Sequence, residues 1–127
     1  MRQLLICVIM LFTVSCKKNN DTNNINLSQR LMTKVAGTST GTINQKIDLT
    51  VTWPYASGCD VLDKFEESRN GNIIIIKAYG HVEQTVCTQE AGYKTKTYNF
   101  VSTTAGTFEL RFTNSDNSYI SHTVTIN

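Results

Sequence analysis

The chain reads Gly106-Thr107-Phe108-Glu109-Leu110-Arg111-Phe112 near its C-terminal end, with a large apolar side chain at every second position from Phe108 onward. Side chains two residues apart lie on the same face of a β-strand, so this spacing predicts a strand with one buried face and one solvated face. The fold class then depends on how often the same spacing recurs.

The same alternation recurs on both sides of this stretch, at Ile47, Leu49, Val51 and Trp53, at Tyr98 and Phe100, and at Ile120, Val124 and Ile126. Turn-forming residues separate the apolar segments, among them Asn70-Gly71 and Thr104-Ala105-Gly106. Pro54 is expected to mark the end of a strand. In total the pattern predicts seven strands, at residues 31–37, 43–53, 60–67, 72–79, 95–101, 107–113 and 119–126.

The segment 60–69 allows two interpretations. Asp60 could cap a short helix that ends at Asn70-Gly71. Val61 and Phe65 also share one strand phase, and a second strand behind the Asn-Gly turn would complete a hairpin, which we prefer. With this strand included, residues 30–127 are predicted to form one all-β domain, an immunoglobulin-like antiparallel β-sandwich of about seven strands.

The first sixteen residues resemble a bacterial lipoprotein signal: Arg2, an apolar run from Leu4 to Val14, and then Ser15-Cys16. An apolar run of about eleven residues is too short to span a bilayer as a helix. We expect residues 1–15 to be a signal peptide and Cys16 to carry the lipid. A secretory peptide without lipid and a buried N-terminal strand are the alternatives. The expected location is the bacterial cell envelope, with the outer membrane as the anchoring membrane.

Residues 16–29 are polar and rich in asparagine, so they bury too little apolar surface to order themselves. We expect them to be a flexible tether with a root-mean-square span of roughly 20 Å. The whole chain has 12 basic and 10 acidic residues, and these are scattered. Without a basic stripe, a nucleic-acid partner is not expected.

Cysteine usage agrees with export. Cys7 lies in the signal segment and Cys16 is assigned to lipid, which leaves Cys59 and Cys87 as one possible disulfide in an oxidising compartment. If successive strands alternate in direction, both cysteines fall at the same end of the domain. Closing a loop of about 29 residues stabilises a fold by roughly 3 to 4 kcal/mol in the chain-entropy model.

Catalytic and metal-binding interpretations are weaker. Cys59 or Cys87 beside His81 could form a nucleophile and base, and adding Asp60 could form a metal site, but a disulfide accounts for both sulfurs. Glu66 and Glu67 are neighbours on a strand and therefore point to opposite faces, so they cannot act together on one substrate. His122 is expected to be an ordinary core or edge residue. No cofactor and no metal are expected.

The aromatic residues are the remaining candidates for binding. The alternation of strands places Trp53, Tyr55, Tyr79, Tyr93 and Tyr119 toward the end that carries the cysteines. Trp53 is expected in the core, and the four tyrosines are candidate ligand-binding residues because exposed rings offer rigid contact area.

These observations favour a non-catalytic binding or structural module for a protein or glycan partner. It would bind through the loops at residues 54–59, 80–94 and 114–118. The alternatives are a protease inhibitor on the same scaffold and, least favoured, an enzyme without a linear motif.

Several short motifs together resemble one group of proteins: Gly58-Cys59, Phe65, Asn70-Gly71-Asn72, Val86-Cys87-Thr88-Gln89, Tyr98-Asn99-Phe100 and the stretch 106–112. The group consists of short immunoglobulin-like lipoproteins from gut-type Gram-negative anaerobes. The resemblance covers most of residues 30–127. Because members of the group are largely of unknown function, the resemblance implies fold and location rather than activity.

Overall fold

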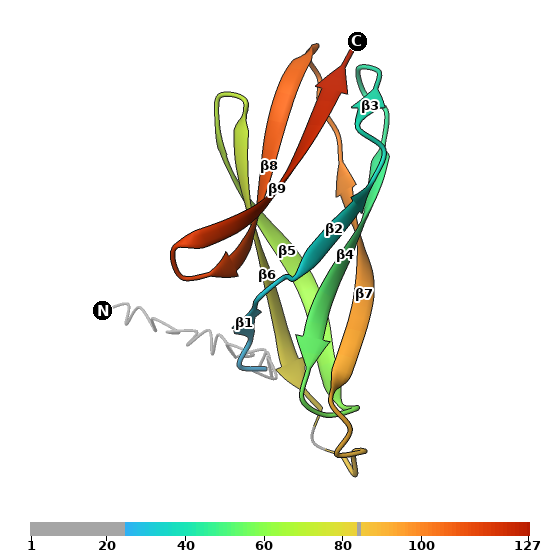
Figure 1. Cartoon of the computed structure of the whole chain (residues 1–127), viewed down its shortest axis with the longest axis vertical. Coiled ribbons are helices and arrows are strands. Elements are labelled where there is room, and N and C mark those ends of the chain that lie inside the picture. Colours follow the sequence, from blue (N-terminus) through green and yellow to red (C-terminus); the bar gives the residue numbers. More distant parts are fainter. Residues whose placement is uncertain (1–24, 84) are drawn as a thin grey trace, which may run out of the picture.

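The computed structural model describes residues 25–83 and 85–127, which form two β-sheets packed face to face (Figure 1). The described residues contain nine strands: β1 (Ser28–Arg30), β2 (Lys34–Gly37), β3 (Thr40–Gly41), β4 (Ile47–Tyr55), β5 (Asp60–Asn70), β6 (Ile73–Val82), β7 (Gly92–Phe100), β8 (Gly106–Ser115) and β9 (Ser118–Ile126). The prediction of an all-β sandwich is confirmed.

The larger sheet is built around β6. β5 pairs with β6 along one side, while β8 and β1 share the other side, and β9 and β3 follow β8. The smaller sheet has the order β2-β4-β7. Most pairings are antiparallel, as expected, but β6 with β8 and β3 with β9 run parallel. The predicted antiparallel sandwich therefore also contains two parallel pairings.

The core consists of the alternating apolar side chains that the sequence pattern identified. Trp53 is 2% exposed and lies between the sheets, as expected. The other buried apolar residues include Ile47, Leu49, Val51, Ile74, Ile76, Tyr98, Phe100, Phe108, Leu110, Phe112, Val124 and Ile126. Burial of one face of each long strand therefore drives the two sheets together.

Residues 60–70 form strand β5, so the preferred hairpin is confirmed and the helix alternative is wrong. Asn70 pairs with Ile73, which leaves Gly71 and Asn72 as a two-residue turn. Gly71 has a φ of 59°, a conformation that glycine adopts without steric cost. The register shifts by one residue between Leu62 and Lys64, which marks a β-bulge.

Pro54 does not end its strand, because β4 continues to Tyr55. The carbonyl of Thr52 faces the β2 side, where it accepts a hydrogen bond from the amide of Thr33. Pro54 is two residues further on and faces the same side, where β2 has no residue opposite it. The missing N–H of proline therefore leaves the pairing of β4 with β7 intact.

The first predicted strand, 31–37, is replaced by two short strands, and the second, 43–53, starts later and is preceded by β3. β1 includes Ser28 and Gln29, which the sequence pattern assigns to the tether at residues 16–29. Both pair with β6, and Arg30 beside them forms an ion pair with Asp60 at 2.7 Å. Backbone pairing and this ion pair order a segment that lacks an apolar period.

The predicted signal peptide, the predicted lipid attachment site at Cys16 and the predicted tether up to residue 24 lie outside the described residues. Within residues 25–83 and 85–127, no helix has the length and apolar character needed to cross a membrane.

Candidate functional site

Cys59 and Cys87 form the predicted disulfide, with their Cα atoms 5.4 Å apart. Cys59 lies between β4 and β5, and Cys87 lies between β6 and β7, so the bond joins two connections that each cross from one sheet to the other (Figure 1, bottom). The two sulfurs are therefore bonded to each other, and neither is a free nucleophile or metal ligand.

His81, the histidine of the alternative catalytic or metal site, contacts an aspartate instead of a cysteine. His81 Nδ1 lies 2.7 Å from the Asp63 carboxylate, at the β-bulge. Among the residues that the structure describes, no group of three His, Cys, Asp or Glu side chains could hold a metal ion.

Two backbone hydrogen bonds hold the loop that carries Cys87 against the β4–β5 turn. The amide of Gly58 donates to the carbonyl of Thr88 at 2.9 Å, and the amide of Glu83 donates to the carbonyl of Cys59 at 2.9 Å. Together with the disulfide, they anchor the loop on both sides of the cysteine. The backbone at Cys87 is therefore anchored to the sandwich.

This end of the molecule exposes apolar side chains. Val86 is fully exposed, Tyr93 is 71% exposed, and Val82 is also exposed. We call these three residues the disulfide-end surface. Their exposure contrasts with the core, where alternate apolar residues are buried. Contiguous exposed apolar patches are typical of binding surfaces, so these three residues are candidates for contact with a partner.

Tyr55, the other candidate tyrosine at this end, is half-buried against the core. It lies opposite Gly92, where a Cβ would approach the Tyr55 hydroxyl to 2.7 Å, so glycine leaves the space that the ring occupies. The Lys94 ammonium lies 4.7 Å from the centroid of the Tyr55 ring. Tyr55 therefore supports the fold here, and Tyr93 is the exposed ring.

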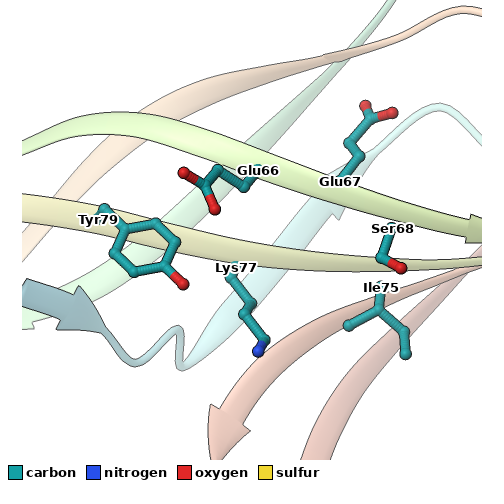
Figure 2. A pocket seen from close by; sticks show the side chains of 6 residues that line it. All are labelled: Glu66, Glu67, Ser68, Ile75, Lys77 and Tyr79. Carbon is teal, nitrogen blue, oxygen red and sulfur yellow. The ribbon is translucent and has the colours of Figure 1, made fainter.

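Tyr79 lies away from this surface, in a shallow groove of about 170 Å³ on the outer face of the larger sheet (Figure 2). We call it the β5–β6 groove, and it is lined by Glu66, Glu67, Ser68, Ile75, Lys77 and Tyr79. Glu66 and Lys77 occupy paired positions on the two strands, as do Ser68 and Ile75. The pairing of β5 with β6 thus brings these side chains together.

The two adjacent glutamates have different partners, as the strand geometry predicts. Glu66 forms an ion pair with Lys64 at 2.7 Å, whereas Glu67 forms one with Arg69 at 2.9 Å and accepts a hydrogen bond from the Tyr98 hydroxyl. Burial, and next this hydrogen bond to Glu67, raise the pKa of Tyr98 well above its ordinary value. The glutamates do not form an acid–base pair.

A family model of the ORF11 beta-sandwich domain matches residues 49–126, which is more than half of the chain. The chain belongs to the ORF11 beta-sandwich domain family. The matched region extends from β4 into β9 and includes both cysteines, the disulfide-end surface and the β5–β6 groove. No curated protein and no solved structure matches the chain.

In this ORF11 beta-sandwich, Tyr119 is not at the disulfide end, contrary to the prediction. Tyr119 pairs with Thr113, whose hydroxyl bonds to the carbonyl of Ile76 near the middle of β6. β1 occupies the half of β6 that leads to the disulfide, so the β8–β9 hairpin turns away before that end (Figure 1). Tyr119 and Tyr93 therefore do not form one surface.

His122 is an edge residue, as expected. It is half-buried in β9, and its Nε2 lies 3.3 Å from the carbonyl of Thr38. This neighbour explains its position in the strand without a ligand.

Sequence reasoning missed the role of two lysines beside Trp53. Lys94 Nζ donates to the carbonyls of Gly58 and Asp60 at 3.0 and 2.6 Å, and Lys96 Nζ donates to those of Leu62 and Asp63 at 2.6 and 2.8 Å. Lys94 and Lys96 alternate with the buried Tyr98 and Phe100 at every second position, which indicates that both lysines lie on the inward face of β7. A second hollow, of about 200 Å³, is lined by these lysines and Trp53. Both lysine ammonium groups already donate hydrogen bonds to backbone carbonyls, so neither is free for a ligand.

Proposed function

We propose that this chain is a non-catalytic binding module of the bacterial cell envelope that recognises a protein partner through the disulfide-end surface. One observation carries the proposal: Val86 is fully exposed beside a cysteine that a disulfide and two flanking backbone hydrogen bonds anchor, and Tyr93 is 71% exposed in strand β7, which pairs with β4. A surface fixed before binding loses little conformational entropy on association.

A protein partner suits this surface better than a glycan does. Two of its three side chains are valines, which offer apolar contact but no hydrogen bonds, and Tyr93 supplies one aromatic anchor. The ring of Tyr55 lies beneath Lys94 and beside Gly92. A glycan at this end would therefore find only one exposed ring.

We also propose that lipid on Cys16 anchors the module to the outer membrane. The proposal is supported by the N-terminal sequence and by the resemblance to lipoproteins of gut-type Gram-negative anaerobes. Cys16→Ser is expected to abolish the acyl mass in mass spectrometry of the native protein and to move it from the membrane fraction to the soluble fraction. Lys18→Ser, which introduces the same residue type two positions further on, serves as the matched control. Retention of Cys16→Ser in the membrane fraction would contradict the anchor.

Site-specific photo-crosslinking in cells tests the protein partner. A photoreactive amino acid in place of Val86 is expected to give a discrete adduct, because that side chain would lie inside the interface. The same amino acid in place of the exposed Lys46, which precedes β4, is the control. Tyr93→Ala should remove the adduct at position 86. Absence of the adduct, or equal adducts at positions 86 and 46, would contradict a protein interface at this end.

The anchored loop also favours a second candidate, a protease inhibitor. A protease can engage an exposed side chain on a constrained loop, and Val86 has this position beside Cys87. An inhibitor should slow a serine or cysteine protease at stoichiometric amounts, and Val86→Asp should abolish the effect. No inhibition across a panel of both classes would remove this candidate and leave the first one standing.

A further inference from the structure

We propose that the β5–β6 groove is a second binding site, for an acidic oligosaccharide whose sugar units carry carboxylates. The inference does not rest on the function proposed above, because the groove lies on the outer face of the larger sheet and shares no residue with the disulfide-end surface (Figure 2). It is carried by three polar groups in the groove that have no partner among the described residues.

The first of these groups is the Lys77 ammonium. Three charged residues line the groove, and both glutamates are already paired, Glu66 with Lys64 and Glu67 with Arg69. Lys77 lies opposite Glu66 in the strand register but forms no ion pair with any described residue. The groove therefore has one uncompensated positive charge, which favours an anionic ligand.

The second and third groups are the hydroxyls of Ser68 and Tyr79, which form no hydrogen bond with any described residue. No buried side-chain nitrogen or oxygen in the described part of the chain lacks a partner, so these hydroxyls are open to solvent. Both can donate and accept hydrogen bonds, which suits the hydroxyls of a sugar.

Apolar surface lies beside these polar groups. Ile75 is half-buried opposite Ser68, and the Tyr79 ring is half-buried at the other end of the groove, where the Lys64 ammonium lies 5.8 Å from its centroid. The C–H face of a sugar ring can pack on such surfaces while its hydroxyls meet the polar groups.

The length of the groove favours an oligosaccharide over a small free anion. Ile75, Lys77 and Tyr79 follow one another at every second position of β6, on one face of the sheet. Ile75 and Tyr79 are four positions apart, a separation of roughly 13 Å along a strand. The three side chains therefore form a row with the Lys77 ammonium in the middle. A carboxylate at Lys77 would then have sugar rings on either side, toward Tyr79 and toward Ile75.

The test is a titration of the full-length chain with its disulfide formed, followed by amide chemical shifts. The probe is hyaluronan hexasaccharide, in which glucuronate alternates with N-acetylglucosamine, and chitohexaose, which lacks the carboxylates, is the neutral comparison. We expect hyaluronan at millimolar concentration to shift the amides of β5 and β6 around Lys77, and chitohexaose to bind at least about tenfold more weakly.

Matched variants assign the contacts. Lys77→Met keeps the aliphatic stem and is expected to weaken binding at least about tenfold, whereas Lys46→Met, the same change at an exposed lysine outside the groove, should have no effect. Tyr79→Leu should weaken binding more than Tyr79→Phe, which retains the ring. Tyr93→Leu should leave this binding unchanged while it weakens crosslinking at position 86, which separates the two proposals.

Four outcomes would overturn the inference: no shifts with hyaluronan at millimolar concentration, equal binding of chitohexaose, equal loss in the Lys77 and Lys46 variants, or equal binding of hexaglutamate. The last result would mean that the groove recognises an acidic peptide rather than a sugar. The unfolding midpoint of each variant shows that a loss of binding is not a loss of fold.

Discussion

At the scale of single residues, Tyr98 shows how the core meets the solvent. Its ring makes edge-to-face contacts with Phe65 and Phe112, at centroid distances of 5.4 and 5.3 Å, while its hydroxyl donates to Glu67. Burial disfavours the phenolate, and the nearby carboxylate accepts the phenol proton in a hydrogen bond that the phenolate would lose. Both causes raise the pKa of Tyr98 in the folded state.

This raised pKa predicts loss of stability at high pH. Unfolded Tyr98 ionises near pH 10, whereas folded Tyr98 stays neutral. Its contribution to the free energy of unfolding is therefore fully present below about pH 10 and is lost as the pH rises above that value. Tyrosine absorbance titration should show one of the five tyrosines ionising only on unfolding. Tyr98→Phe should lower stability at about pH 8 but flatten its decline between about pH 9 and 11. An equally steep decline in Tyr98→Phe would contradict this account.

At the scale of strands, the two lysines of β7 link the sheets along one edge of the sandwich. Lys96 Nζ bonds to the carbonyls of Leu62 and Asp63, which lie at the β-bulge of edge strand β5. Removing this cation would leave both carbonyls without their donor and the bulge without its contact to β7.

We therefore predict that Lys96→Met lowers the free energy of unfolding by about 1 to 3 kcal/mol, the usual effect of leaving partly buried acceptors unsatisfied. Lys46→Met, at an exposed lysine, should change it by less than about 0.5 kcal/mol. Urea denaturation measures both values. Equal stability of the two variants would show that water replaces the ammonium without penalty.

The strands that could be predicted from sequence are those that bury an apolar face. The recurrence of apolar residues at every second position located β4 and β6 to β9, because each of these strands has several inward apolar side chains. β1 and β3 have no such period, since they form by backbone pairing with strands far along the chain, as Gln29 does with Tyr79. Their existence depends on the assembled sheet and has no local signal.

The same distinction applies to the candidate sites. Cysteine usage predicted the disulfide, and the alternation of strand directions placed both cysteines and Tyr93 at the same end of the domain. The β5–β6 groove depends on the register that sets Ser68 opposite Ile75 and Glu66 opposite Lys77. Which lysine pairs with Glu66 could not be read from sequence, because Lys64 on its own strand and Lys77 across the hairpin are both within reach of it.

At the scale of the whole molecule, the disulfide joins two crossings between the sheets. β4 and β7 belong to the smaller sheet, β5 and β6 to the larger one, and the bond links the β4–β5 turn to the β6–β7 loop. It therefore restricts how far the two sheets can separate at this end, and it also fixes the loop that presents Val86. The groove on the outer face of the larger sheet depends only on the pairing of β5 with β6.

The double variant Cys59→Ala, Cys87→Ala should therefore affect the two surfaces differently. We predict a loss of about 2 to 4 kcal/mol in the free energy of unfolding, because the unfolded chain regains the freedom of the closed loop. At a temperature where the variant is still folded, crosslinking at position 86 should fall, because the loop is no longer fixed, while hyaluronan should still shift the amides around Lys77. Denaturation, crosslinking and titration of the same preparation measure the three effects. Parallel loss of both binding activities in a folded variant would mean that the disulfide also maintains the register of the larger sheet.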